Sequence, residues 1–156
     1  MHTRLIGEYN FPNALAAVTI GHFFGVEAEK IDKALNEYEP RNNRSQLKKT
    51  ADNTLIIDAY NANPTSMLAA IGNFRNMQAE KKMLILGDMR ELGKDSAEEH
   101  QRIVDYLEEY GFEDVILVGE LFAETRHTYT TYPDAPALIA ALQKNKPCGK
   151  TILIKG

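Results

Sequence analysis

The stretch DAYNANP, which begins at Asp58, carries a carboxylate, a phenol and two amides. A carboxylate accepts hydrogen bonds from ribose hydroxyls, and carboxamides bind peptide or carboxylate groups through donor and acceptor atoms. The candidate ligand-binding residues of this stretch are therefore Asp58, Tyr60, Asn61 and Asn63. Two structural roles compete with this interpretation. Asn63 is placed to cap a helix that Pro64 would begin, and Asp58 also fits a solvated acid at a turn.

A second stretch, LGDMRELGKDS at residues 86–96, follows another apolar run and gives Asp88 the same position as Asp58. It looks like the phosphate-binding loop G-x-x-x-x-G-K-[ST] but does not match it, because five residues separate its glycines and an aspartate follows its lysine. The CGKT string at Cys148 lacks the first glycine of that motif. The chain therefore carries no P-loop. A long loop with glycine turns is the competing structural explanation for residues 86–96.

Composition narrows the possible partners. The 156 residues have a formal net charge of −4, which gives no reason to expect nucleic acid or an anionic membrane as a partner. Cys148 is the only cysteine, which excludes an internal disulfide and fits a reducing cytoplasm. The four histidines show no metal-ligand spacing, so we expect no metal ligands here, and the pattern leaves open whether His100 faces solvent. We expect neither a signal peptide nor a membrane-spanning helix.

The elements that must position these residues alternate along the chain. Four near-continuous apolar runs predict buried strands at 54–59, 82–88, 114–120 and 150–156. A more polar run at 127–132 predicts an edge strand. Helical periodicity fills the gaps at 65–77, 96–110 and 134–143. Two helices, 12–24 and 27–36, precede a polar linker at 37–46. This alternation predicts an α/β fold with a mainly parallel sheet, whose carboxyl edge would hold Asp58 and Asp88.

Several strings together resemble a known family, the Mur ligases, which are ATP-dependent amide ligases of peptidoglycan precursor synthesis. The strings are GEYNFPNALAA (7–17), NNRSQ (42–46), DAYNANPTSMLAAI (58–71), LGDMRELG (86–93), EEH (98–100) and ILIKG (152–156). The YNANP…SM and LGDM.ELG strings resemble the branch that adds D-alanyl-D-alanine to UDP-N-acetylmuramoyl-tripeptide. The resemblance implies that residues 1–40 are the carboxyl-terminal helical strip of a central ATP-binding domain, and that residues 41–156 are a Rossmann-like α/β domain.

The resemblance also implies roles for individual residues. The ATP contacts would come from Asn10, Asn13, Arg44 and Asp58. Arg44 would be the catalytic residue, because it would reach the phosphates when the domains close. The D-alanyl-D-alanine contacts would come from Tyr60, Asn61, Asn63 and Asp88. The P-loop and the Mg²⁺ ligands would lie upstream, so we expect this chain alone to have no ligase activity. Two positions depart from the family pattern, which usually has His at Tyr9 and often has Gly at Asn43.

Two alternatives to this interpretation stay open. The first is another Mur or folylpolyglutamate-type ligase, against which the YNAN string argues. The second is a phosphoacceptor regulatory module, of which the chain has superficial features, since Asp58 and Asp88 end strands and Lys155 lies in the last strand. Whichever holds, the apolar helix 12–24 is expected to need a packing partner, and dimerisation through it is a hypothesis.

Overall fold

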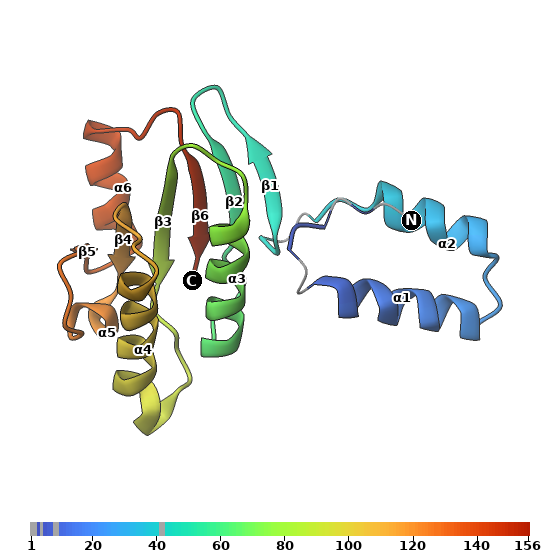
Figure 1. Cartoon of the computed structure of the whole chain (residues 1–156), viewed down its shortest axis with the longest axis horizontal. Coiled ribbons are helices and arrows are strands. Elements are labelled where there is room, and N and C mark those ends of the chain that lie inside the picture. The colour runs from blue at the N-terminus through green and yellow to red at the C-terminus, as the bar shows by residue number, and fades with distance from the viewer. Residues whose placement is uncertain (1–2, 4, 8–9, 41–42) are drawn as a thin grey trace.

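The computed structural model describes residues 3, 5–7, 10–40 and 43–156. Its helices and strands follow the predicted order (Figure 1). In chain order they are α1 (Phe11–Phe23), α2 (Ala28–Glu37), β1 (Gln46–Lys49), β2 (Thr54–Asp58), α3 (Pro64–Asn76), β3 (Lys82–Gly87), the 3₁₀ turn η2 (Gly93–Asp95), α4 (Ser96–Glu109), β4 (Val115–Val118), α5 (Glu120–Ala123), β5 (Thr130–Tyr132), α6 (Ala135–Lys144) and β6 (Thr151–Lys155).

The strands form one six-stranded sheet in the order β1-β2-β6-β3-β4-β5. All neighbouring strands are parallel except β1, which pairs antiparallel with β2. The last strand in sequence thus lies between β2 and β3, and its register sets Asp58 opposite Lys155. The predicted α/β fold with a mainly parallel sheet is confirmed.

The helices cover the two faces of the sheet with separate apolar clusters. Helices α3 and α4 pack on the face that carries Ile56, Leu84 and Leu153. Helix α6 packs on the opposite face through Leu138, against Met83 and Ile152 among others. These helices and the sheet form the layers that hold the carboxyl ends of the strands in a fixed arrangement.

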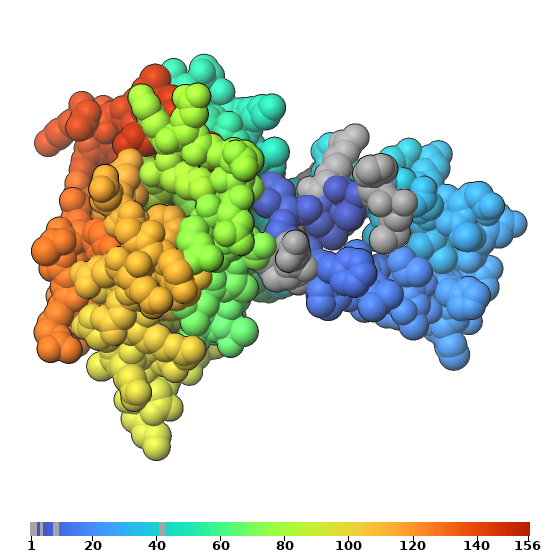
Figure 2. Space-filling view, in the orientation of Figure 1, coloured from blue at the N-terminus to red at the C-terminus, as the bar shows by residue number. Residues whose placement is uncertain are grey.

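Helices α1 and α2 stand beside the sheet, near β1 and away from α6 (Figures 1 and 2). Helix α1 begins with Pro12 in its first turn, as expected for a residue without a backbone N–H. Its large apolar side chains are mostly exposed, among them Phe11, Leu15, Ile20 and Phe23. In the described part of the chain, no helix is both long and apolar enough to cross a bilayer.

Two elements differ from the sequence-based expectation. Strand β1 begins at Gln46, inside the predicted linker, because its polar sequence QLKK gives no strand signal on an exposed edge. Helix α5 is only four residues long, too short to show a helical period. Tyr9 lies outside the described residues.

Candidate functional site

The carboxyl ends of β2, β3, β4 and β6 meet at one edge of the sheet, where a groove of about 760 Å³ opens. Three predicted residues line it, namely Tyr60, Asn61 and Asp88. Other walls come from loops that sequence analysis did not single out, including Arg90 and Glu120. A crevice at this edge is the usual ligand site of open α/β sheets.

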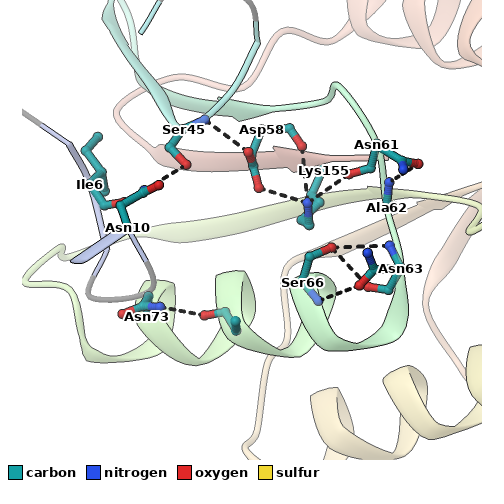
Figure 3. A network of polar contacts seen from close by, with 11 residues as sticks. Ile6, Asn10, Ser45, Asp58, Asn61, Ala62, Asn63, Ser66, Asn73 and Lys155 are labelled. Carbon is teal, nitrogen blue, oxygen red and sulfur yellow. Dashed lines mark hydrogen bonds and ion pairs between the residues drawn. The ribbon is translucent and has the colours of Figure 1, made fainter. Parts of the chain in front are cut away.

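Asp58 is held by two groups within the fold. One carboxylate oxygen, Oδ1, accepts a hydrogen bond from the backbone N–H of Ser45 at 3.0 Å. The other, Oδ2, lies 2.8 Å from Nζ of Lys155 (Figure 3). The structural role that sequence analysis considered for Asp58, a solvated acid at a turn, does not describe it, because only 14% of its side chain is exposed.

Lys155 is a buried neighbour of Asp58 that sequence analysis did not place at this site. Its side chain is 2% exposed, and Nζ also donates to the carbonyl oxygens of Asn61 at 3.1 Å and Asp58 at 3.5 Å. A buried ammonium is tolerated only when charge and hydrogen-bond partners replace water, and here three acceptors do so. The sequence signal is a charged residue at the end of an apolar strand, which by itself also fits the phosphoacceptor alternative.

Asn10 links the amino-terminal segment to Asp58. Its Nδ2 donates to the carbonyl of Ile6 at 2.8 Å and lies 3.2 Å from Oγ of Ser45 (Figure 3). Its Oδ1 accepts from Nδ2 of Asn13 at 3.2 Å. Three of the residues predicted to contact ATP, Asn10, Asn13 and Asp58, therefore belong to one polar network that passes through Ser45.

Arg44, the fourth predicted ATP residue, is exposed and stacks on Tyr60. Its guanidinium carbon lies 3.7 Å from the centre of the Tyr60 ring. The flanking residues Asn43 and Ser45 have φ angles of 53° and 48°, in the left-handed region that Ser adopts rarely. The structure thus brings together a residue predicted for ATP and one predicted for the dipeptide.

The two amides of the YNANP loop have different surroundings. Oδ1 of Asn61 accepts from the N–H of Ala62 at 2.8 Å, and the residue lines the groove. Asn63 caps α3, since its Oδ1 accepts from the N–H of Ser66 at 2.9 Å and Oγ of Ser66 accepts from the N–H of Asn63. The predicted cap, with Pro64 at the start of the helix, is confirmed.

Asp88 follows β3 and contacts helix α5 at the far side of the groove. Its carboxylate accepts from the backbone N–H groups of Leu121 at 3.1 Å and Phe122 at 3.0 Å, which begin α5. The φ of Gly119 is 127°, and a Cβ there would overlap the Asp88 carboxyl, so only glycine leaves room for this contact. Asp88 therefore fixes the groove wall through backbone amides.

His100 is fully buried behind Asp88. Its Nε2 accepts from the N–H of Met89 at 3.0 Å, and its Nδ1 lies 2.7 Å from the carbonyl of Ser96, which assigns the proton to Nδ1. The ring packs edge-to-face on Phe122, with centroids 4.7 Å apart. The EEH string thus contributes a histidine that ties α4 to the loop after β3.

Asp58 and Arg44 keep hydrogen-bonding capacity that contacts within the described chain do not use. Each carboxylate oxygen of Asp58 has a single strong donor from the protein, which leaves capacity to accept from a hydroxyl. The guanidinium of Arg44 pairs with no carboxylate in the described part of the chain, so its N–H donors are available. Among the described residues, no three His, Cys, Asp or Glu side chains group as metal ligands.

Comparison with known proteins gives a consistent result. Residues 43–156 match the family described as Mur ligase, glutamate ligase domain. The UDP-N-acetylmuramoyl-tripeptide–D-alanyl-D-alanine ligase of Bacillus subtilis is 35% identical over 97% of this chain, and the match covers 35% of that protein. The corresponding Treponema pallidum ligase is 39% identical over 64% of this chain and 21% of its own length.

Solved structures agree with these relatives. A crystal structure of MurF from Acinetobacter baumannii matches 99% of this chain and 36% of its own, with a TM-score of 0.76 and 32% identity. The fold is also shared with MurF of Thermotoga maritima in complex with ADP, at a TM-score of 0.79 and 18% identity. The chain spans about a third of the length of these relatives.

Proposed function

The chain belongs to the Mur ligase family, and on that premise we propose that it is the carboxyl-terminal part of an ATP-dependent ligase that adds D-alanyl-D-alanine to UDP-N-acetylmuramoyl-tripeptide. Residues 1–40 would be the end of the central domain and residues 41–156 the carboxyl-terminal domain. The observation that carries the proposal is the groove at the carboxyl edge, which joins Tyr60 and Asn61 of the YNANP loop to Asp88 of the LGDM string. Family membership favours a ligase over a phosphoacceptor module.

The proposed ATP contacts follow the polar network. Asp58 accepts from the ribose, Asn13 approaches the adenine, and Asn10 holds Asn13 in place through its Oδ1. Arg44 reaches the phosphates and neutralises negative charge as the amide forms. ATP would supply the phosphoryl group that activates the tripeptide carboxylate. The P-loop and Mg²⁺ ligands belong to a part of the enzyme outside this chain, and the whole acts in the cytoplasm.

The proposed dipeptide contacts lie on the other side of the YNANP loop. Tyr60 and Asn61 form one wall of the groove and Asp88 supports the opposite one. Asn63 is not among the residues that line the groove, and its Oδ1 caps α3, so we assign only its side-chain NH₂ group to the approach of the dipeptide. The task of these groups is to hold the amine of D-alanyl-D-alanine in line for attack, which is a positioning effect.

The test is an assay of the full-length protein that contains this chain. We expect ADP release in the presence of UDP-N-acetylmuramoyl-tripeptide to depend on D-alanyl-D-alanine and not on L-alanine, D-glutamate or L-glutamate. Equal turnover with glutamate would replace the proposal with the folylpolyglutamate-type alternative. The isolated 156-residue chain is expected to show no turnover, and detectable ligation by it would contradict the placing of the P-loop elsewhere.

The role of Arg44 is tested in the same assay. Arg44→Ala is expected to lower kcat/KM for ATP by roughly 10²–10³-fold, the usual effect of removing one charge-stabilising donor. Arg102→Ala is the matched control, because Arg102 is exposed on α4 and, among the residues that the structure describes, forms an ion pair only with Glu99. An effect below twofold for Arg44→Ala would remove it from the catalytic site.

We also propose that helix α1 packs against the rest of the ligase through its exposed apolar side chains, such as Phe11, Leu15 and Phe23. In the isolated chain this face would drive dimerisation. Light scattering at increasing concentration should then give a dimer mass, and Leu15→Glu should restore the monomer. A monomeric parent chain at high concentration would contradict this.

A further inference from the structure

We propose that Tyr60 is a positioning residue for Arg44, which it holds in the direction of the ATP phosphates by stacking on the guanidinium. The inference rests on the proposed function, in which Arg44 contacts those phosphates. It adds a task for Tyr60 beyond lining the dipeptide groove, and it connects the two substrate sites through one side chain.

The contact is close and lies on the surface. The guanidinium carbon of Arg44 is 3.7 Å from the centre of the Tyr60 ring, within the range in which a cation is attracted to an aromatic face. Tyr60 is 64% exposed, so its ring is not needed to fill the apolar core. An exposed contact of this kind shifts a conformational equilibrium by about two- to fivefold.

The residues beside each partner are fixed, which gives the stack a rigid base. Ser45, next to Arg44, is buried and donates its N–H to Asp58, two residues before Tyr60. Lys155 holds the other oxygen of Asp58 and also the carbonyl of Asn61, which follows Tyr60 (Figure 3). Each partner of the stack therefore has a directly adjacent residue that is held by a hydrogen bond: Ser45 beside Arg44 and Asn61 beside Tyr60.

The backbone around Arg44 is held in a conformation that it would rarely adopt alone. Asn43 and Ser45 have φ angles of 53° and 48°. Such angles persist where the surrounding contacts determine them, and the contacts here include the Ser45–Asp58 hydrogen bond, the Asn10–Ser45 hydrogen bond and the stack. The direction of the Arg44 side chain is thus set by its neighbours.

Stacking suits this purpose because it uses the face of the guanidinium and leaves its edge free. The N–H donors of arginine lie in the plane of the group, where they can bind phosphate oxygens two at a time. A carboxylate partner would instead occupy those donors and cancel the charge. Tyr60 therefore orients Arg44 without competing with the phosphates.

A direct measurement tests the stack in the 156-residue chain. The ring current of Tyr60 should shift the Hδ resonances of Arg44 upfield in NMR spectra, and Tyr60→Leu should abolish the shift while Tyr60→Phe retains it. Tyr110→Leu is the matched control, because Tyr110 is also part-exposed and stacks with Arg75 at 4.0 Å, away from the groove. Unshifted Arg44 resonances in the parent chain would overturn the proposal.

Kinetics of the full-length ligase test the consequence. Tyr60→Leu should lower kcat/KM for ATP by about two- to fivefold, and Tyr60→Phe should restore most of that loss. Tyr110→Leu should leave the ATP kinetics unchanged. In an Arg44→Ala background, Tyr60→Leu should have no further effect on kcat/KM for ATP, because the residue that it positions is gone.

Three kinetic outcomes would also overturn the inference. In the first, Tyr60→Leu raises KM for D-alanyl-D-alanine alone, which would leave Tyr60 only a wall of the groove. In the second, Tyr60→Leu raises kcat/KM for ATP, which would mean that the stack holds Arg44 away from the phosphates. In the third, Arg44→Ala itself does not change kcat/KM for ATP. That result would contradict the proposed role of Arg44 and, with it, the positioning role of Tyr60, even where NMR detects the stack.

Discussion

Strands β2 and β3 both deliver an aspartate to the same edge of the sheet, and the two side chains are equally buried, each 14% exposed. Their partners differ. Asp58 accepts from the buried ammonium of Lys155 and from one backbone amide, that of Ser45, whereas Asp88 accepts from two backbone amides in α5. The two carboxylates thus differ in whether an opposite charge is among their partners, and this changes the consequence of removing them.

The difference lies in what each aspartate leaves behind. Removing Asp58 leaves the ammonium of Lys155 without a counter-charge in a site that excludes water, because the Lys155 side chain is only 2% exposed. Removing Asp88 leaves neutral N–H groups without partners. An uncompensated buried charge costs more free energy than an unpaired amide, about 3–5 against about 1–3 kcal/mol. Substitutions of the two aspartates should therefore lower the free energy of unfolding by clearly different amounts.

The largest expected effect belongs to Asp58→Ala. We expect it to lower the free energy of unfolding by about 3–5 kcal/mol, since it leaves Lys155 buried without its counter-charge. Urea unfolding followed by circular dichroism measures this, with the exposed Asp52→Ala as control. The double variant Asp58→Leu/Lys155→Met should be more stable than Asp58→Ala, because neither charge remains. A loss below 1 kcal/mol for Asp58→Ala would show that the pair contributes little.

Asp88→Ala should have an intermediate effect of about 1.5–3 kcal/mol, the range for hydrogen bonds to a charged group. It removes the acceptor of both the Leu121 and the Phe122 amides. Asp88→Asn keeps one acceptor oxygen and should recover part of the loss. The same urea titration decides this, and equal losses for the Asn and Ala variants would indicate that charge and not hydrogen bonding stabilises the α5 end.

His100→Phe should cost about 1–3 kcal/mol, because it fills the space of the ring but leaves the Met89 N–H without an acceptor. Hydrogen exchange measured by NMR should show faster exchange of the Met89 amide, while the amides of β2 stay protected. His22→Phe, on the exposed face of α1, is the control. Unchanged exchange at Met89 would mean that the histidine does not hold the loop after β3.

Much of the fold was predictable because its signals are local. Apolar runs identified most of the parallel strands, and Asn63 was recognisable as a helix cap from its neighbours in sequence. Strand β1 and helix α5 were missed because a polar edge strand and a single helical turn carry no periodic signal.

The site was predictable only in part, because its pairings are long-range. Sequence analysis placed Asp58 and Asp88 at one edge, which follows from the parallel sheet. It did not place Lys155 beside Asp58, 97 residues away, because that contact depends on β6 lying next to β2. Nor did it anticipate that Arg44 would stack on Tyr60, since the interaction joins two loops whose approach is set by the Ser45–Asp58 bond.

The smallest expected effect belongs to Asn63, which sharpens the contrast between the two helix starts. After β2 the chain caps its next helix locally, with Asn63 and Ser66, whereas α5 depends on Asp88, more than 30 residues away. Asn63→Ala should therefore cost only about 1 kcal/mol, and Asn63→Ser should stay close to the parent because serine also caps well. Urea unfolding of Asn63→Ala combined with Asp88→Ala should give the sum of the two single losses. A difference of more than about 0.5 kcal/mol between the loss in the double variant and the sum of the two single losses would mean that the helix starts are coupled across the groove.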